Sequence, residues 1–226
     1  MGKRRARVRA GSRIPDLGYY IIVTDTKETE KLYFEGLRDN LPSHLQSRLV
    51  IKVFPKTDTK NLLDRCIHES NKNPQYRIPW IIFDRDEVLF FDDLIADAHR
   101  AHVNTGWSNP CFEVWLHAYF ENLQYSQDSI QCCNQFSKKY HELTRTEYEK
   151  SDSSLYRNLL TYGDEEKAIT RAKYHMTNLL SSNKNSIPSQ LSPATTLYKL
   201  IPQRSESSGS ITMVPLPSEC RESKVR

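Results

Sequence analysis

The amino-acid sequence predicts an α/β protein in which a parallel sheet flanked by helices is followed by a C-terminal helical extension. Three observations lead to this class. Strand-like and helix-like segments alternate four times between residues 18 and 121, which is typical of a parallel sheet covered on both faces. Beyond that point the main periodic segments are helical. The 226 residues are enough for one domain with its own hydrophobic core.

Four strands are predicted from short runs of β-branched, aromatic and aliphatic residues. In chain order they are Tyr19–Thr24, Leu49–Phe54, Pro79–Phe83 and His102–Thr105. A helix is expected after each strand, because apolar residues recur there at helical spacing. These helices cover Glu28–Leu41, Lys60–Ser70, Val88–Arg100 and Cys111–Glu121.

The second half of the chain predicts three further helices, separated by polar stretches. They cover Gln131–Tyr140, Ser153–Leu160 and Asp164–Leu180, and a short last element follows at Pro193–Leu200. From residue 203 the chain is rich in Ser, Pro and charge, which favours disorder. We therefore divide the chain into a disordered basic arm (1–16), an α/β domain (17–122), a helical extension packed on that domain (123–202) and a disordered tail (203–226).

Positive charge is concentrated at the N-terminus. Residues 1–13 hold six of the 32 Lys and Arg side chains and no acid, so the remaining 26 basic groups face 28 acidic ones. An Arg-rich arm is suited to binding the phosphates of nucleic acid. The candidates in this arm are Arg4, Arg5, Arg7 and Arg9. The alternative is a solvated terminus with no ligand.

Hydropathy and cysteine usage exclude several classes. No apolar run approaches the roughly 18 residues that a membrane-spanning helix needs, and the basic N-terminus lacks the apolar segment of a secretory signal. The five cysteines show no CxxC spacing, so neither a zinc ribbon nor a disulfide framework is indicated. We expect a cytoplasmic protein with no membrane contact.

Carboxylates follow three of the four predicted strands. Asp25 and Glu30 come after the first strand, Asp84 and Asp86 after the third, and Glu113 lies at the start of the helix after the fourth. Sites in open parallel sheets lie at the carboxyl ends of the strands, so these acids should converge and suit a hard cation such as Mg²⁺. Each also has a local alternative, as a turn former or as an acid favoured by a helix dipole.

Four motifs resemble the RloB/AbiLii family. They are IIVTDTKETEKLYF at residues 21–34, FDRDE at residues 83–87, SNPCFEVWL at residues 108–116 and SPATT at residues 192–196. The third of these is the most specific. The resemblance extends from about residue 18 to residue 200, which is nearly the whole chain that we expect to fold.

This resemblance implies a Toprim-like protein of bacterial abortive-infection and restriction-linked defence systems, often found beside an ATP-binding partner. Toprim domains hold magnesium with a glutamate after strand one and a DxD motif after strand three. The implied catalytic residues are Asp25, Glu30, Asp84, Asp86 and Glu113, all but Glu30 being implied metal ligands. Where the family has glutamate followed by glycine, this chain has Asp25 and Thr26.

The expected function is a nuclease that uses Mg²⁺ or Mn²⁺ to cleave phosphodiester bonds in RNA, including tRNA, or in DNA, as an antiphage effector. Two such ions about 3.5–4 Å apart can activate a water and stabilise the leaving oxygen. Arg85 and Lys150 are candidate contacts to the nucleic acid. Two alternatives stay open: a non-catalytic nucleic-acid-binding or sensor subunit working with an ATPase, and a receiver-like or small-molecule α/β domain. The oligomeric state is also open.

Overall fold

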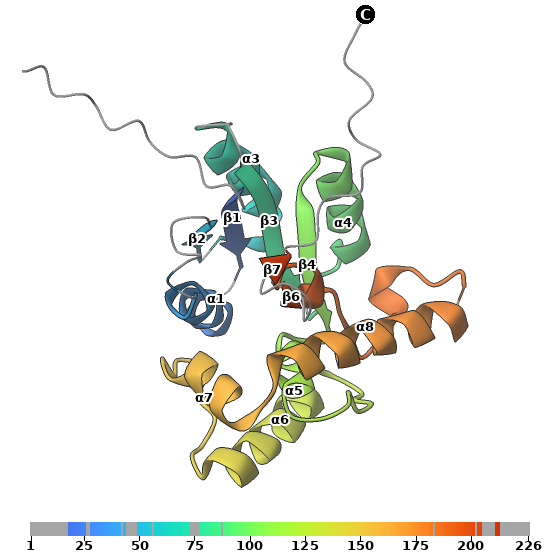
Figure 1. Ribbon diagram of the computed structural model, residues 1–226. Helices are drawn as coiled ribbons and strands as arrows, with labels where there is room; N and C mark the ends of the chain where they lie inside the picture. The colour runs from blue at the N-terminus through green and yellow to red at the C-terminus, as the bar shows by residue number, and fades with distance from the viewer. Residues whose placement is uncertain are drawn as a thin grey trace, which may run out of the picture.

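A five-stranded, mostly parallel sheet forms the centre of the computed structural model (Figure 1), which confirms the predicted α/β class. The strand order is β2-β1-β3-β4-β5. The first four strands run parallel, and β5 is antiparallel to β4. Their bounds are Gly18–Thr24 (β1), Leu49–Phe54 (β2), Arg77–Asp84 (β3), Asn104–Asn109 (β4) and Ala194–Thr195 (β5). The structure describes residues 18–25, 28–41, 43, 49–55, 57–72, 77–86, 88–182, 184–201, 203–204 and 211–212.

Seven α-helices are described in these ranges. They are α1 (Thr29–Asp39), α3 (Leu62–Asn71), α4 (Phe91–Arg100), α5 (Glu113–Ala118), α6 (Ser129–Thr144), α7 (Leu155–Tyr162) and α8 (Glu165–Ser182). Short 3₁₀ turns cover Thr59–Asn61, Pro188–Gln190 and Leu197–Lys199. Within the segment expected to be a disordered tail, β6 (Gln203–Arg204) pairs with β7 (Ile211–Thr212). None of the described helices has the length and apolar character needed to cross a membrane.

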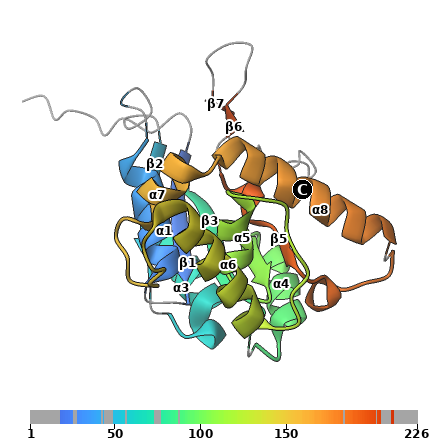
Figure 2. The same cartoon turned by 90° about the horizontal axis from the view of Figure 1, so that it is seen from below.

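Each face of the sheet supports its own hydrophobic core. Side chains alternate along a strand, so Tyr20 and Ile22 of β1 point to one face while Ile21 and Val23 point to the other. Helices α3 and α4 cover the second face. Helix α1 and the helical extension cover the first, where α7 lies beside α1 and α8 runs past β5 (Figure 2).

An aromatic cluster joins the extension to the sheet. Tyr33 of α1 is fully buried, and its ring makes edge-on contacts with Phe34, Phe112, Trp115, Tyr119 and Tyr156. Gly36 permits the close approach of α1 to α7, because a Cβ there would lie 2.5 Å from Cβ of Tyr156. This packing holds the loop between α6 and α7 beside the first turn of α1.

The fourth strand lies later in the chain than we predicted. It covers Asn104–Asn109 instead of His102–Thr105, and His102 has a positive φ of 56° that separates α4 from the strand. The strand buries polar residues that hydropathy does not assign to a core. Ser108 and Thr195 share a hydrogen bond of 3.0 Å, and Nδ2 of Asn109 donates to backbone carbonyls of the C-terminal segment. Buried polar groups are tolerated when such partners satisfy them.

Candidate metal centre at the carboxyl ends of the strands

Four carboxylates from separate parts of the chain converge at the carboxyl edge of the sheet. Asp25 follows β1, Glu30 lies in the first turn of α1, Asp84 ends β3, and Glu113 begins α5. We call these four residues the acidic cluster. In the pairing of β1 with β3, Thr24 lies opposite Ile82, so β3 continues two residues beyond the end of β1, to Asp84. Glu30 and Glu113 are 1% and 2% exposed, so both carboxylates have lost most of their contact with water.

Burial and mutual repulsion raise the pKa values of two members. Burial, followed by the negative charge of Asp25, raises the pKa of Glu30 to about 8. The pKa of Asp84 is raised well above its usual range by burial and then by the charges of Glu30, Asp25 and Glu113. Both effects disfavour the ionised form. The four acids therefore act on one another as a single cluster.

Hydrogen-bond donors from the described residues reach Asp84 and Asp25. The backbone N–H of Phe112 donates to Oδ2 of Asp84 at 3.0 Å, and Thr59 Oγ1 donates to Oδ2 of Asp25 at 3.4 Å. Within the described residues, Oε2 of Glu30 is buried and accepts no hydrogen bond. A buried acceptor without a donor is costly, so this oxygen has free capacity for a cation.

Two residues from the loop between α6 and α7 contact Glu113. Tyr148 donates its phenolic proton to Oε1 of Glu113 at 3.0 Å, and Nζ of Lys150 lies 3.6 Å from the same oxygen. The charge of Glu113 raises the pKa of Lys150. Thr29 Oγ1 donates to the backbone carbonyl of Lys150 at 3.3 Å, which fastens this loop to the start of α1.

The residues present fit a hard divalent cation. The cluster offers only carboxylate oxygens, the ligands that Mg²⁺ and Mn²⁺ prefer. Oε2 of Glu30 is buried without a donor among the described residues, and the ion pair that Lys150 forms is with Glu113. A divalent cation would supply the missing positive charge.

Arg85 and Asp86, which follow Asp84 in the FDRDE motif, lie outside the acidic cluster. Strand β3 ends at Asp84, so the alternation that would align Asp86 with it stops there. Asp86 is exposed in the following turn, and its backbone N–H donates to the carbonyl of Pro110. Nη1 of Arg85 donates to the carbonyl of Val88 at 3.1 Å, and its guanidinium lies 5.9 Å from the ring centre of Phe91. The side chain of Arg85 is thus engaged at the start of α4.

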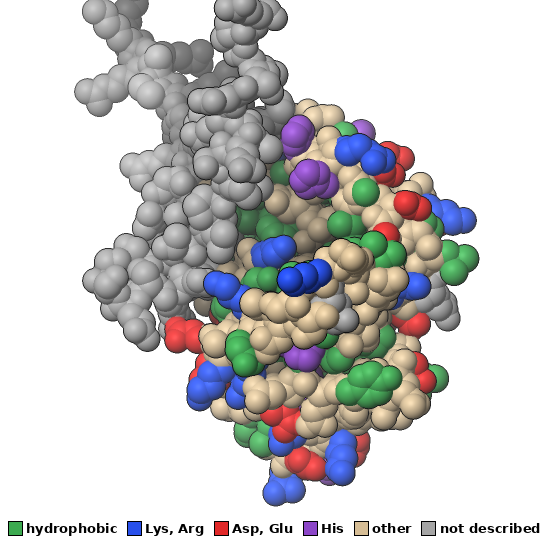
Figure 3. Space-filling model, turned by 90° about the vertical axis from the view of Figure 1, so that its right-hand side faces the viewer, with side chains coloured by type: hydrophobic (Ala, Val, Ile, Leu, Met, Phe, Trp, Pro, Cys, Tyr) green, Lys and Arg blue, Asp and Glu red, His purple; other side chains and the backbone are tan. Residues whose placement is uncertain are grey.

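Candidate nucleic-acid contacts are distributed unevenly. The arm residues Arg4, Arg5, Arg7 and Arg9 lie outside the described residues. On the face drawn in Figure 3, the described Lys and Arg side chains are interspersed with Asp and Glu and form no single basic patch. Lys150 is exposed over 63% of its side chain and stands beside the acidic cluster. It is the predicted contact that the structure brings next to the acids.

Sequence reasoning identified Lys150 but missed three other neighbours of Glu113. Tyr148 was one of 12 tyrosines, with no local signal to distinguish it. Cys111 and Cys133 lie beside Glu113 although they are 22 positions apart in the chain. Cys111 stands two residues before Glu113, and this local pairing of a thiol with a carboxylate is a sequence signal for Cys111 alone.

The comparison with known protein families agrees with the resemblance drawn from the motifs. The chain matches the family described as RloB-like protein over residues 20–203, which is more than half of its length. No curated protein and no solved structure matches it. The matched range contains all four members of the acidic cluster. The chain belongs to the RloB-like protein family.

Proposed function

We propose that this protein is a metal-dependent phosphodiesterase that cleaves nucleic acid as an endonuclease. The observation that carries the proposal is the convergence of Asp25, Glu30, Asp84 and Glu113 at the carboxyl ends of the strands, where Glu30 and Glu113 are buried, Asp25 and Asp84 are partly exposed, and neighbouring charges raise the pKa values of Glu30 and Asp84. A fold gains nothing in stability from such an arrangement unless a cation is bound. Clustered carboxylates with perturbed pKa values are typical of functional sites.

The chain's own residues have distinct parts in this proposal. The acidic cluster would hold Mg²⁺ or Mn²⁺, which, when bound, activates a water and stabilises the leaving oxygen of a phosphodiester. Tyr148 orients Glu113 by donating to Oε1. Lys150 balances the charge of Glu113 and, being largely exposed, is also available to a substrate phosphate. Exposed Asp86 stays a candidate ligand at the outer side of the cluster.

The substrate and setting follow from the family. RloB-like membership supports a role in bacterial defence against phage, with RNA (tRNA among the candidates) or DNA as the substrate. The same membership supports an ATPase as the partner. The arm residues Arg4, Arg5, Arg7 and Arg9 would add phosphate contacts whose strength falls with salt. In this proposal the protein acts in the cytoplasm.

A non-catalytic role is the second candidate, favoured by one observation. The strand-one position carries Asp25 and Thr26 in place of the glutamate and glycine of the resembling family. Aspartate is one methylene shorter than glutamate, so its carboxylate reaches less far. In the non-catalytic role, the protein binds nucleic acid or senses a signal for an ATPase partner, and the acidic cluster holds a structural cation.

A cleavage assay separates the two candidates. Purified protein is incubated with tRNA, other RNA, and single- and double-stranded DNA, in Mg²⁺ or Mn²⁺ with EDTA as the metal-free control. The nuclease proposal requires cleavage of at least one substrate that stops with EDTA and with Asp84→Asn. Asp93→Asn is the matched control, because Asp93 is an exposed carboxylate on α4.

Wild type that cleaves none of these substrates, alone or with an ATPase encoded beside it, would favour the non-catalytic role. Cleavage that persists in EDTA, or is undiminished in Asp84→Asn, would contradict a metal centre at the acidic cluster. Cleavage lost equally in Asp93→Asn would also count against it, since that carboxylate lies outside the cluster.

A further inference from the structure

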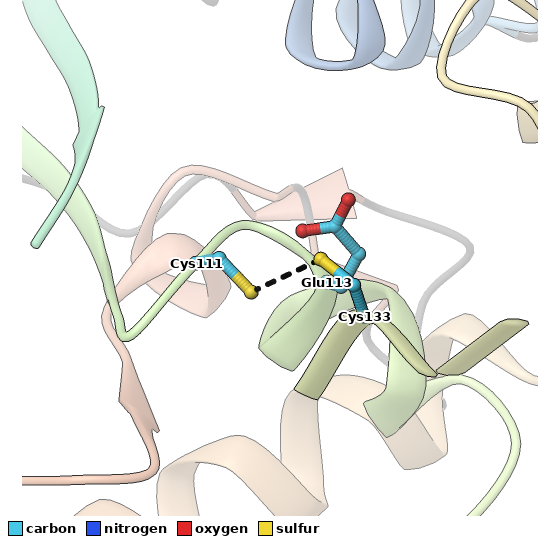
Figure 4. A group of neighbouring side chains, drawn as sticks. All are labelled: Cys111, Glu113 and Cys133. Carbon is cyan, nitrogen blue, oxygen red and sulfur yellow. Dashed lines mark hydrogen bonds between the residues drawn. The ribbon is translucent and has the colours of Figure 1, made fainter. Parts of the chain in front are cut away.

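We infer that Cys111, Glu113 and Cys133 form a binding site for a thiophilic divalent cation, with Zn²⁺ as the best fit. Within the described residues this is the group of side chains whose ligand atoms all lie within 4.8 Å of one another. Figure 4 shows the two sulfur atoms facing each other with the Glu113 carboxylate beside them. Cys111 lies between β4 and α5, and Cys133 lies on α6. The site therefore joins the α/β domain to the helical extension.

The sulfur separation suits tetrahedral zinc. Sγ of Cys111 lies 3.8 Å from Sγ of Cys133. Two Zn–S bonds of about 2.3 Å at the tetrahedral angle place their sulfur atoms about 3.8 Å apart. The thiols would need little movement to receive the ion, whereas a disulfide of about 2.05 Å would need them to approach much further.

The surroundings suit an ion that binds two thiolates and one carboxylate. Such a set leaves one net negative charge around Zn²⁺, and Nζ of Lys150 lies 3.6 Å from Oε1 of Glu113 to balance it. The phenol of Tyr148 fixes the orientation of the same carboxylate, as an outer partner of a metal ligand commonly does. Cys133 is partly exposed, which gives the ion a path from solvent. Three protein ligands leave a fourth position for water.

This site differs in chemistry from the acidic cluster. Thiolates select zinc and other soft cations, while carboxylates alone select magnesium and manganese. Binding would release the two thiol protons to solvent. Glu113 belongs to both groups, so zinc would withdraw one member from the acidic cluster. The zinc inference stands on the sulfur geometry and does not depend on nuclease activity.

Cobalt binding tests the ligand set directly. The full chain, metal-free and kept reduced by a non-thiol reductant, is titrated with Co²⁺, which reports thiolate ligands by a sulfur-to-metal charge-transfer band. We expect one equivalent of Co²⁺ to produce the band and Zn²⁺ to abolish it. Cys111→Ser and Cys133→Ser should each weaken binding at least about 10-fold, since even outer partners of a metal site contribute about 10–100-fold.

Matched variants locate the site. Cys66→Ser, which changes a buried cysteine in the other core, is the matched control. Cys132→Ser tests whether the third nearby thiol, which packs in the same small cluster as Cys111, is a ligand. Both should keep the band. Asp84→Asn should keep it too, because Asp84 belongs only to the acidic cluster. This last variant separates failure of the zinc site from failure of the proposed metal centre. Circular dichroism checks that each variant is folded.

Thiol protection provides a measurement that needs no variant. Zinc should slow alkylation of Cys133 in the wild-type protein at least about 10-fold, followed by mass spectrometry, and magnesium should not. The inference would be overturned by a wild-type protein without a charge-transfer band, by unchanged alkylation in zinc, or by folded Cys111→Ser and Cys133→Ser variants that retain the band. Equal loss of the band in Cys132→Ser would overturn the ligand assignment.

Discussion

Two regions of this molecule surround buried or partly buried carboxylates in opposite ways. At the junction of α5, α7 and α8, Oε2 of Glu165 accepts hydrogen bonds of 3.0 Å from the phenols of Tyr119 and Tyr156. Tyr33 shares a further bond of 2.8 Å with Tyr119. Here one acid is matched by neutral donors. In the acidic cluster, four acids face one another, and burial together with the neighbouring charges raises the pKa values of Glu30 and Asp84.

The difference separates a structural from a functional use of buried charge. A satisfied polar network favours a single packing arrangement of the helices around it. Clustered carboxylates raise each other's pKa and destabilise the metal-free fold, which persists because the sheet and the α1–α7 packing hold the segments in place. The Tyr119–Glu165 network belongs to that supporting framework. The acidic cluster has the properties of a site that awaits a cation.

The largest expected effect is on activity, from Asp84→Asn. Removing this charge should lower metal-dependent cleavage at least about 100-fold, since loss of an outer partner of a metal site alone costs about 10–100-fold. The same change should raise the melting temperature of the metal-free protein at pH values above about 8, where the cluster is more ionised, because one of the mutually repelling acids can no longer ionise. Cleavage rates measured with metal test the loss of activity, and thermal melts in EDTA test the gain in stability. A variant that is less stable and fully active would place Asp84 outside the site.

Glu165→Leu should have the opposite effects: lower stability of the metal-free protein and unchanged metal binding. It removes the carboxylate oxygen that accepts from the phenols of Tyr119 and Tyr156, and a hydrogen bond to a charged group contributes about 1.5–3 kcal/mol. Urea unfolding of the metal-free protein should show this loss. Binding of Mn²⁺ to the folded variant should stay as in wild type. Unchanged stability would remove the contrast between the two regions.

The stability of the metal-free protein should fall as pH rises from about 4.5 to about 8. The pKa of Glu30 is raised from 4.5 to about 8 in the folded protein, so in this window the folded state binds more protons than the unfolded state. One such group contributes at most about 1.4 kcal/mol per pH unit. Urea midpoints in EDTA across this range measure the slope.

Glu30→Gln is the control for that pH dependence. The variant keeps the shape of the side chain and cannot ionise, so the slope should flatten. Saturating Mg²⁺ should also reduce the slope in the wild-type protein, because the cation stabilises the ionised carboxylates. A slope that Glu30→Gln leaves unchanged would assign the pH dependence to other groups.

Tyr148→Phe should have the smallest effect. Tyr148 donates to Glu113 as Tyr119 and Tyr156 donate to Glu165, but it serves a member of the acidic cluster. Loss of this hydrogen bond should lower stability by about 0.5–1.5 kcal/mol and weaken Mn²⁺ binding by about 10-fold. Stability lost without any change in Mn²⁺ affinity would make this phenol a structural donor like the other two.

The sequence was most informative where local patterns determine structure. The apolar runs of β1 and β3 predicted two central strands, and the rule that sites follow strand ends predicted that Asp25 and Asp84 would meet. The fourth strand was misplaced because Ser108 and Asn109 are buried with hydrogen bonds to residues 80 or more positions away. Tyr148 and the partner of Cys111 depend on how α6 packs, which no local pattern encodes.

Direct binding of Mn²⁺ tests the central claim, that the acidic cluster is a metal centre. Free Mn²⁺ is measured by electron paramagnetic resonance while it is titrated into wild-type protein, Asp84→Asn and Asp93→Asn near pH 8, the raised pKa of Glu30, where this carboxylate is partly ionised before the ion binds. We expect wild type and Asp93→Asn to bind Mn²⁺ alike and Asp84→Asn to bind it at least about 10-fold more weakly. Wild-type protein that binds no Mn²⁺, or Asp84→Asn that binds it as wild type does, would contradict the claim.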